Sequence, residues 1–458
     1  MADLDSRTLT DDRAAGQTAS WLPLITVCSG FFVAILDTTV VTIALNKVAS
    51  DLHTSVTGLQ WVVDGYTVVL ASLLLFSGSL ADRLGARRVF QAGLALFGAA
   101  SLGCALSGTL AMLVTMRVIQ GAGAALLIPG SLALIRAAYP DPAARAKAIG
   151  VWGAVGATAA SFGPVVGGLL TDTLGWPPVF AINVPICAVA LVLVQRSVPS
   201  VPGVPRSLYP LSQLAIMATV AGLTSVAIQL GSEHPNALVL WGSAVLFVLG
   251  AVTAVVNHRR AEHPLLPRAV LAKPEFTVSN AVGFLLNFGF YGQLFVLSLF
   301  LQRELGMSPL IAGVALLPET AMGILASTIG GRIVAQRGTR LVVIAGLLAG
   351  AVGFGLLSAA KGGMPYWPLI VPLVLIGFGT AFCMPAATTA TVEAVPANQA
   401  GFAGAAFNTS RQIGGALGVA ALGSILAVAG GSVTVAMLCG CAAFAIGAVL
   451  AARALPAH

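Results

Sequence analysis

Five ionisable side chains lie far inside long apolar stretches of the chain: Asp37, Asp64, Arg117, Glu319 and Arg411. Carboxylates take up and release protons or attract cations, whereas a guanidinium group stays charged and binds anions. An ionised side chain at the centre of a bilayer costs about 2.5 kcal/mol or more, so such residues usually face a cavity or a partner of opposite charge. These five residues are therefore candidates for proton and ligand chemistry, provided that the apolar stretches cross a membrane.

The composition indicates that these apolar stretches do cross a membrane. Of 458 residues, 57% are hydrophobic and 9% are charged, whereas soluble domains carry about 25% charged residues. Helices satisfy their own backbone hydrogen bonds in lipid, and the 52 Gly and 24 Pro suit closely packed membrane helices. We therefore expect an all-α integral membrane protein.

Other reactive residue types do not suggest a site. The six Cys lie inside apolar runs without metal-ligand spacing, the five His fall in predicted loops or at the terminus, and there is no Gly-x4-Gly-Lys phosphate loop. The net charge of +7 comes from short basic clusters between apolar runs, not from a basic surface with aromatic residues. We expect no cofactor, no metal, no nucleic-acid partner and no enzyme activity.

Stretches of about 20 apolar residues indicate fourteen membrane spans. They begin near residues 21, 58, 89, 110, 146, 177, 208, 237, 276, 310, 341, 366, 401 and 432. The segments between spans hold 18 Lys and Arg on the side of the N-terminus and 3 on the opposite side. The positive-inside rule then predicts a multi-pass protein of the cytoplasmic membrane with both termini in the cytoplasm.

The sequence also repeats itself. Gly78-x6-Gly85-x-Arg87 recurs as Gly331-x6-Gly338-x-Arg340, and Gly121-x7-Pro129 recurs as Gly377-x7-Pro385. Two similar six-helix bundles with two inserted helices explain this spacing, and such paired bundles are typical of alternating-access transporters. The predicted units are a cytoplasmic tail (1–20), an N-terminal bundle (21–195), two inserted helices (208–256) and a C-terminal bundle (276–454).

The rise of about 1.5 Å per helical residue places Asp37, Asp64 and Arg117 at a similar depth in the outer half of the membrane. Two acids and one base are therefore expected to meet and to couple protons to transport. Two alternatives stay open: Asp37 and Arg117 form a purely structural pair, and Asp64 is simply solvated near the interface.

In the second bundle, Glu319 and Arg411 are both predicted near mid-membrane. Glu319 is a candidate to bind a cationic ligand or carry a proton, and the alternative is a buried Glu319–Arg411 pair that only stabilises the bundle. Phe288 and Tyr291 are candidates for an apolar cavity lining, although they fit lipid contact or core packing equally well.

Six motifs in order carry a resemblance to the major facilitator superfamily. They are Leu36-Asp37-Thr38-Thr39-Val40-Val41, Gly78-Ser-Leu-Ala-Asp82-Arg83-Leu-Gly85-Ala-Arg87-Arg88, Leu113-x3-Arg117-x2-Gln120-Gly121-x-Gly123, Ala159-x3-Gly163-Pro164-x2-Gly167-Gly168, Trp176-x3-Phe180-x-Ile-Asn183-x-Pro185 and Asn408-x2-Arg411-Gln412-x-Gly414. The set is similar to the fourteen-span drug:proton antiporters of that superfamily. Trp61-Val-Val-Asp64-Gly65-Tyr66 narrows the resemblance toward methylenomycin-resistance-like exporters.

The resemblance implies roles for two further groups of residues. Gly78, Asp82, Arg83, Gly85 and Arg87 would form a conformational lock, in which Asp82 faces the N-terminus of span thirteen near residue 398. Pro164, together with Gly163, Gly167 and Gly168, would form the bent, closely packed helix typical of the antiporters. Asn408 lies in the thirteenth-span motif and is grouped with the substrate-binding candidates.

The function implied is proton-coupled export of small amphipathic drugs or antibiotics by alternating access, by a monomer. A proton-coupled transporter of an endogenous metabolite, working in either direction, is the alternative. A membrane enzyme or sensor is disfavoured because no segment after the tail could hold a soluble catalytic domain.

Overall fold

The computed structural model describes residues 21–199, 203, 209–232, 234–261, 268–396, 399–428 and 432–456. Within them every regular element is helical, and fourteen helical segments are long and apolar enough to cross a membrane. The all-α architecture and the fourteen predicted spans are thereby confirmed. The predicted tail (1–20), residue 208 and residue 398 lie outside the described residues.

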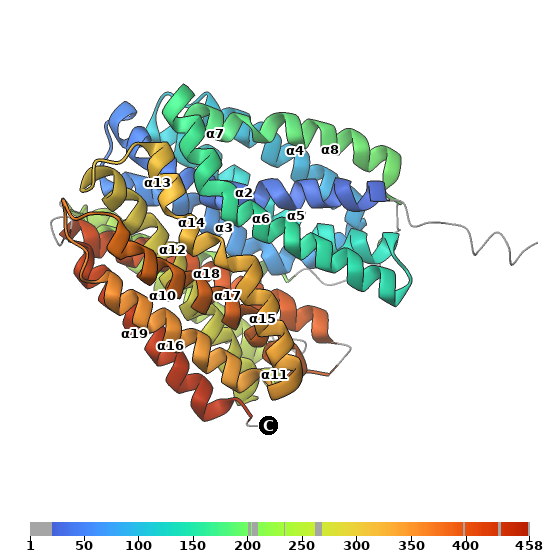
Figure 1. Cartoon of the computed structure of the whole chain (residues 1–458). Coiled ribbons are helices and arrows are strands. Elements are labelled where there is room, and N and C mark those ends of the chain that lie inside the picture. Colours follow the sequence, from blue (N-terminus) through green and yellow to red (C-terminus); the bar gives the residue numbers. More distant parts are fainter. Residues whose placement is uncertain are drawn as a thin grey trace, which may run out of the picture.

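The N-terminal bundle contains the first six spans (Figure 1). Its helices are α2 (Trp21–Asp51), α3 (Val56–Leu84), α4 (Ala86–Ala105), α5 (Leu110–Ala138), α6 (Pro142–Leu174), α7 (Pro177–Ala181) and α8 (Asn183–Ser197). Side-chain caps begin two of them: the Thr109 hydroxyl accepts a hydrogen bond from the amide of Met112, and Asp141 accepts one from Ala144. Such caps satisfy amides that have no partner within the helix.

The inserted helices are α9 (Pro210–Leu230) and α10 (Ala237–Arg260). α9 packs against α3 and α18 and so touches both bundles, whereas α10 packs on α9. Gly250 is the one buried residue of α10, and large apolar side chains such as Leu238 and Trp241 point outward. An almost fully exposed apolar helix is expected in lipid, where outward-facing apolar side chains are favourable.

The C-terminal bundle contains the last six spans. Its elements are α11 (Arg268–Leu271), α12 (Pro274–Arg303), α13 (Pro309–Ala315), α14 (Leu317–Thr320), α15 (Met322–Arg337), α16 (Thr339–Leu357), the 3-10 turn η1 (Trp367–Leu369), α17 (Ile370–Glu393), α18 (Ala400–Val428) and α19 (Val433–Ala454). The tenth span is broken into α13, α14 and α15, with Pro318 at the break. Proline removes a backbone donor and thus disrupts a helix interior.

The repeat in the sequence is also a repeat in structure. Gly85 and Gly338 stand at corresponding helix junctions with φ of 92° and 76°, a conformation that glycine adopts without strain. Arg87 donates to the carbonyl of Gln195 near the end of the last helix of its bundle, and Arg340 donates to the carbonyl of Ala452 near the end of the last helix of the other. Each arginine therefore ties the third span of its own bundle to the last one.

The two bundles share a core over only part of their length. We call the side on which α2 begins the terminus side and the opposite one the far side. The far-side half of α2, from Leu36 to Val48, belongs to one apolar cluster with α12, α16 and α17. The terminus-side half, from Leu24 to Ala34, belongs to a second cluster made of N-terminal helices. The bundles therefore pack together on the far side.

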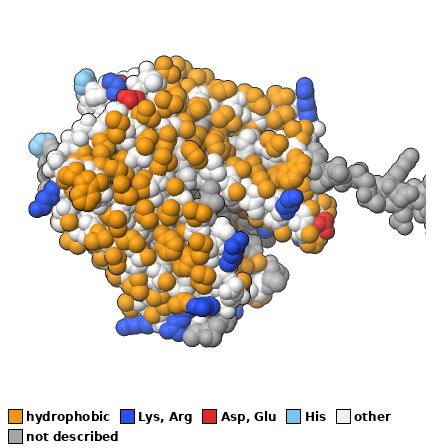
Figure 2. Space-filling view, viewed as in Figure 1, with side chains coloured by type: hydrophobic (Ala, Val, Ile, Leu, Met, Phe, Trp, Pro, Cys, Tyr) orange, Lys and Arg blue, Asp and Glu red, His pale blue; other side chains and the backbone are white. Residues whose placement is uncertain are grey.

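Hydrophobic side chains cover most of the face seen in Figure 2, and Lys and Arg are few there. Exposed apolar side chains include Val189 and Val192 on α8 and Leu348 and Val352 on α16. An apolar surface of this extent matches a molecule surrounded by lipid.

Candidate functional site

An ion pair lies inside the N-terminal bundle. Arg117 on α5 donates from a terminal nitrogen to Asp37 Oδ2 on α2, and both side chains are buried, at 1% and 0% exposed. The Arg117 Nε also donates to the carbonyl of Val62 on α3 at 2.8 Å. The guanidinium thus joins three helices, and the predicted meeting of Asp37 and Arg117 is confirmed in geometry.

Neutral side chains complete this cluster. Gln120 donates to Asp37 Oδ1 at 2.8 Å, and its own carbonyl oxygen accepts from Arg117 at 2.7 Å. Asn183 donates to the same Asp37 oxygen at 3.1 Å. The Arg117 guanidinium also lies over the ring of Tyr66, 4.3 Å from its centre. Both oxygens of Asp37 are therefore bonded, and its charge is compensated by a cation in direct contact.

Asp64 stands outside this pair, contrary to the expectation that two acids and one base meet. Its side chain is fully buried on α3, where one oxygen accepts from the Thr67 hydroxyl at 3.2 Å. Its Oδ2 makes no hydrogen bond with any described residue, and no described cation lies within 4 Å of the carboxylate. The Arg117 Nε instead donates to the carbonyl of Val62, which lies on the same helix as Asp64.

Glu319 occupies the broken part of the tenth span. Its side chain is 1% exposed, Oε2 accepts from Gln293 on α12 at 3.1 Å, and Oε1 has no partner among the described residues. The carbonyl of Glu319 lies against Gly377 on α17, just as the carbonyl of Tyr66 lies against Gly121 on α5. Glu319 therefore occupies the position in the second bundle that Tyr66 occupies in the first.

Arg411 lies on α18 and makes no ion pair with Glu319: within the described chain, no carboxylate comes within 4 Å of it. Its Nε donates to Asn287 on α12 at 3.5 Å, and its guanidinium lies 5.9 Å from the centre of the Phe407 ring. The structural-pair alternative for Glu319 and Arg411 is therefore absent from this conformation.

The aromatic candidates lie on α12 beside these groups. Tyr291 packs against Gly415 on α18 and meets the ring of Phe290 edge to face. Phe288 stacks on Phe284 at 6.3 Å between ring centres. Asn408 lies one turn before Arg411 and is partly exposed. All three candidates therefore belong to the α12–α18 region.

The glycines of the fifth span make close contacts both within the N-terminal bundle, to α2, and across to α13 of the C-terminal bundle. A side chain at Gly163 would collide with Thr39 on α2, and one at Gly167 with the carbonyl of Val40. Gly168 likewise lies against Pro309, while Gly313 on α13 lies against the carbonyl of Pro164. These four contacts are in the far half of α6, so α6 closes on both α2 and α13. The helix itself runs without interruption through Pro164.

The predicted lock residues lie where α3 passes into α4. Gly78 faces Pro129 on α5 at ordinary contact distance, and Gly85 forms the junction. Arg83 lies in the last turn of α3, and its carbonyl lies against residue Gly203. Arg87 is bound inside its own bundle. Asp82 is exposed at the end of α3, and its predicted partner at residue 398 lies outside the described residues.

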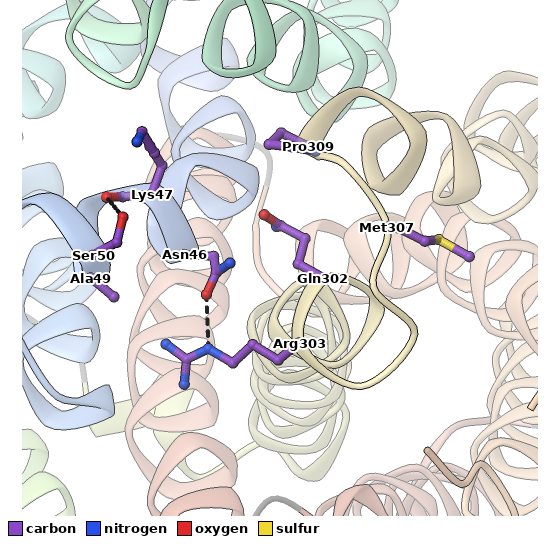
Figure 3. Close-up of a pocket in the computed structure, with 8 residues that line it drawn as sticks. All are labelled: Asn46, Lys47, Ala49, Ser50, Gln302, Arg303, Met307 and Pro309. Carbon is purple, nitrogen blue, oxygen red and sulfur yellow. Dashed lines mark hydrogen bonds between the residues drawn. The ribbon is translucent and has the colours of Figure 1, made fainter. Parts of the chain in front are cut away.

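A row of hydrogen bonds, which we call the α2–α12 seam, joins the bundles on the far side. Ser298 donates to the carbonyl of Thr42 at 2.7 Å, Gln302 to that of Ile43 at 3.0 Å, and Arg303 to Asn46 at 2.9 Å. Figure 3 shows the last contact beside a pocket of about 470 Å³. The pocket is lined by Asn46, Lys47, Ala49, Ser50, Gln302, Arg303, Met307 and Pro309.

The terminus side is open by comparison. Side chains added at Gly150 and Gly153 on α6, or at Gly404 on α18, would meet nothing within 4 Å. The far-side glycines on the same helices touch a neighbouring backbone, as Gly167 and Gly418 do. The bundles are therefore closely packed on the far side, whereas these terminus-side glycines lack such contacts.

Comparison with known proteins decides the family. A family model described as Major Facilitator Superfamily matches residues 27–419 and 279–458. The chain belongs to the major facilitator superfamily. It is a multi-pass membrane protein of that superfamily, and the resemblance based on the motifs is confirmed.

Its relatives include resistance proteins. The chain is 38% identical over 408 residues to a methylenomycin A resistance protein of Bacillus subtilis, covering 88% of this chain and 87% of that protein. It is 36% identical to the methylenomycin A resistance protein of Streptomyces coelicolor, covering 89% and 86%. It is 33% identical to the multidrug resistance protein Stp of Mycobacterium tuberculosis, covering 89% and 76%.

Solved structures share the fold at lower identity. A peptide transporter bound to sulfate matches with a TM-score of 0.73 at 17% identity, covering 94% of each chain. A bacterial homologue of the lysosomal transporter Spinster, in an inward-facing and unoccupied conformation, matches with a TM-score of 0.66 at 16% identity, covering 96% of this chain and 98% of that one.

Sequence reasoning missed the neutral partners of the charged residues. Gln120 and Asn183 stand inside quoted motifs, and their amide groups within apolar runs were the available signal. Asn287 and Gln293 stand outside every motif, yet each binds a charged residue. No group of three or more His, Cys, Asp or Glu able to hold a metal occurs among the described residues.

Proposed function

We propose that this protein is a proton-driven antiporter that exports small amphipathic drugs or antibiotics across the cytoplasmic membrane by alternating access. The observation that carries the proposal is the buried Asp37–Arg117 pair, a proton-accepting group in contact with a fixed cation. The relatives named for antibiotic resistance support export of drugs. Both termini would lie in the cytoplasm, so that the terminus side is the inner side.

Proton binding would act through α2. A proton on Asp37 removes the Coulomb attraction that holds Arg117, whose charge persists. The same helix carries Thr39 and Val40 against the α6 glycines and the carbonyls of Thr42 and Ile43 in the α2–α12 seam. A shift of α2 at Asp37 would therefore also move the α2 carbonyls about 8 Å farther along the same rigid helix. These carbonyls lie where the bundles pack together on the far side.

Asp64 would be a second proton-carrying acid. It is buried, one of its oxygens lacks a partner among the described residues, and no described cation compensates it within 4 Å. A carboxyl group in such surroundings is more stable when neutral. Asp64 would thus bind its proton independently of the Asp37–Arg117 pair.

The substrate would bind to the C-terminal bundle. Glu319, Arg411 and Asn408 offer polar groups, and Phe288 and Tyr291 offer apolar surface. Substrate and proton would shift the equilibrium between inward-open and outward-open states by their unequal affinities for the two. Gly78, Asp82, Arg83, Gly85 and Arg87 would form the lock that holds the inner side closed, and the protein would work as a monomer.

Transport by inverted membrane vesicles tests the proposal. We expect that wild-type protein takes up drug when a proton gradient is imposed and stops when an ionophore collapses the gradient with ATP still present. Asp37→Asn should abolish gradient-driven uptake, because the amide cannot take up the proton. Asp37→Glu should retain part of it. Asp51→Asn, at the exposed end of the same helix, is the matched control and should transport normally.

Two results would refute the proposal. Undiminished uptake after the gradient collapses would show that protons do not drive transport. Normal gradient-driven uptake by a folded Asp37→Asn variant would assign Asp37 a structural role. Uptake into whole cells instead of inverted vesicles would favour the alternative of a metabolite importer.

A further inference from the structure

The α12–α18 region of the C-terminal bundle contains a cluster of hydrogen-bond donors without matching acceptors. Arg411 has five N–H donors, and its one hydrogen bond in the described chain runs from Nε to Asn287. The Asn287 amide nitrogen is itself without a partner there, although this side chain is 2% exposed. Two neighbouring side chains therefore present unused N–H groups. An anion accepts hydrogen bonds, so these donors are the groups needed to bind one.

No acid among the described residues compensates this cluster. No described carboxylate lies within 4 Å of Arg411, and Glu319 is bonded to Gln293 instead. Arg411 is partly buried, and a charge that is partly withdrawn from water without a partner is destabilising. A ligand that supplies the missing negative charge would therefore stabilise Arg411.

The cluster is reachable from the space between the bundles. Gly401, Gly404, Asn408 and Arg411 follow one another at spacings of three and four residues, so they share one face of α18. This face is partly exposed along its length, and a side chain at Gly404 would meet nothing within 4 Å. Gly401 lies near Arg136 of the N-terminal bundle, so the face turns toward that bundle and not toward lipid.

Apolar groups surround the donors. The Phe407 ring lies 5.9 Å from the guanidinium, and the Arg411 stem passes close to Gly283, which has no side chain to block it. Tyr291 packs one turn farther along against Gly415. A ligand with an anionic head and an apolar body would match both parts of this surface.

We propose that Arg411 and Asn287 bind the carboxylate group of amphipathic acids, which this protein therefore accepts as substrates. This inference rests on the proposed export function and names a class of substrate for it. Two N–H groups of the guanidinium can hold a carboxylate in a fork, while the Asn287 carbonyl keeps Arg411 in place through its Nε.

Binding to purified protein in a neutral detergent tests the assignment with two fluorescent probes, 1-pyrenebutyrate and its uncharged methyl ester. Arg411→Gln should weaken binding of the acid by at least about tenfold, the equivalent of one charge-assisted hydrogen bond. It should change binding of the ester by less than about twofold. Arg411→Lys keeps the charge and loses the fork, so its affinity for the acid should lie between those of the wild type and Arg411→Gln. Arg337→Gln, an exposed arginine at the end of α15, is the control for overall charge.

Asn287→Leu provides a second test that retains Arg411, and it decides the question if Arg411→Gln does not fold. It should also weaken binding of the acid more than binding of the ester. Equal losses for both probes, or no loss for either, would overturn the assignment. Because binding needs no proton gradient, a split between acid and ester would stand even if gradient-driven transport failed.

Discussion

The arginines within the spans of the two bundles, Arg117 and Arg411, differ in how their charge is compensated. In the N-terminal bundle, the carboxylate of Asp37 contacts the guanidinium of Arg117, and both are surrounded by hydrogen-bonding partners. In the C-terminal bundle, Glu319 and Arg411 are each held by one neutral amide, and neither contacts an opposite charge among the described residues. A compensated pair is suited to switching when one member is neutralised, whereas uncompensated groups are suited to receiving a ligand.

The contrast is sharpest at positions related by the internal repeat. Tyr66 and Glu319 both place a carbonyl against a glycine of the neighbouring helix. Tyr66 covers Arg117 with its ring and donates its hydroxyl to the carbonyl of Ala34. Glu319 leaves one oxygen without a partner in the described chain. The same backbone frame therefore supports a closed polar cluster in one bundle and an incomplete one in the other.

We expect the largest effect from a variant that breaks the Asp37–Arg117 pair. Arg117→Met leaves the buried Asp37 without its cation and should lower the free energy of unfolding by about 3 to 5 kcal/mol. Heat denaturation of the purified protein in detergent, followed by the loss of the monodisperse peak, would measure it. The control is Arg337→Met, at an exposed position. Wild-type stability of Arg117→Met would mean that the pair does not stabilise the N-terminal bundle.

A smaller effect is expected from crowding the contact that joins the bundles. Gly168→Ala places a methyl group against the carbonyl of Pro309 in the C-terminal bundle and should cost about 1 to 3 kcal/mol in the far-side-closed conformation. Reactivity of a cysteine placed on the far side should rise, because that side opens more often. Gly150→Ala, on the same helix but in open space, should behave as wild type. Equal reactivity of the two variants would contradict the contact.

The smallest effect on stability is expected at the uncompensated acid. Glu319→Gln strands no cation, so the free energy of unfolding should change by less than about 1 kcal/mol. If Glu319 binds cationic substrates, resistance to them should fall more than resistance to neutral compounds, because the amide keeps hydrogen bonding but loses the charge. Resistance profiles and membrane protein levels would measure both. Reduced protein together with equal losses for all compounds would contradict this assignment.

Much of the fold follows from the sequence because lipid imposes a simple rule. A run of apolar residues long enough to cross the membrane must be helical, and fourteen such runs are visible. The meeting of Asp37 and Arg117 also follows, since both lie at one depth. Depth does not give direction around a helix axis, however. Asp64 shares that depth, yet it makes no contact with Arg117 within 4 Å.

The C-terminal site was harder to predict because its key partners are neutral. Asn287 and Gln293 do not stand out in a membrane helix, where polar amides also serve helix packing. Only their position opposite Arg411 and Glu319 gives them a role. The sequence analysis did not predict the break of the tenth span at Pro318, and proline alone could not have shown it, because proline also occurs inside the unbroken α6 at Pro164.

The α2–α12 seam has a consequence for how the sequence of this protein can drift. Ser298 and Gln302 donate to main-chain carbonyls of α2 and not to its side chains. Every amino acid supplies the same carbonyl, so substitutions at Thr42 or Ile43 that preserve the helix also preserve both acceptors. The information that specifies these two bonds is therefore held almost entirely by α12. For these two bonds the requirement for a particular side chain falls on α12, whereas α2 supplies only its main chain.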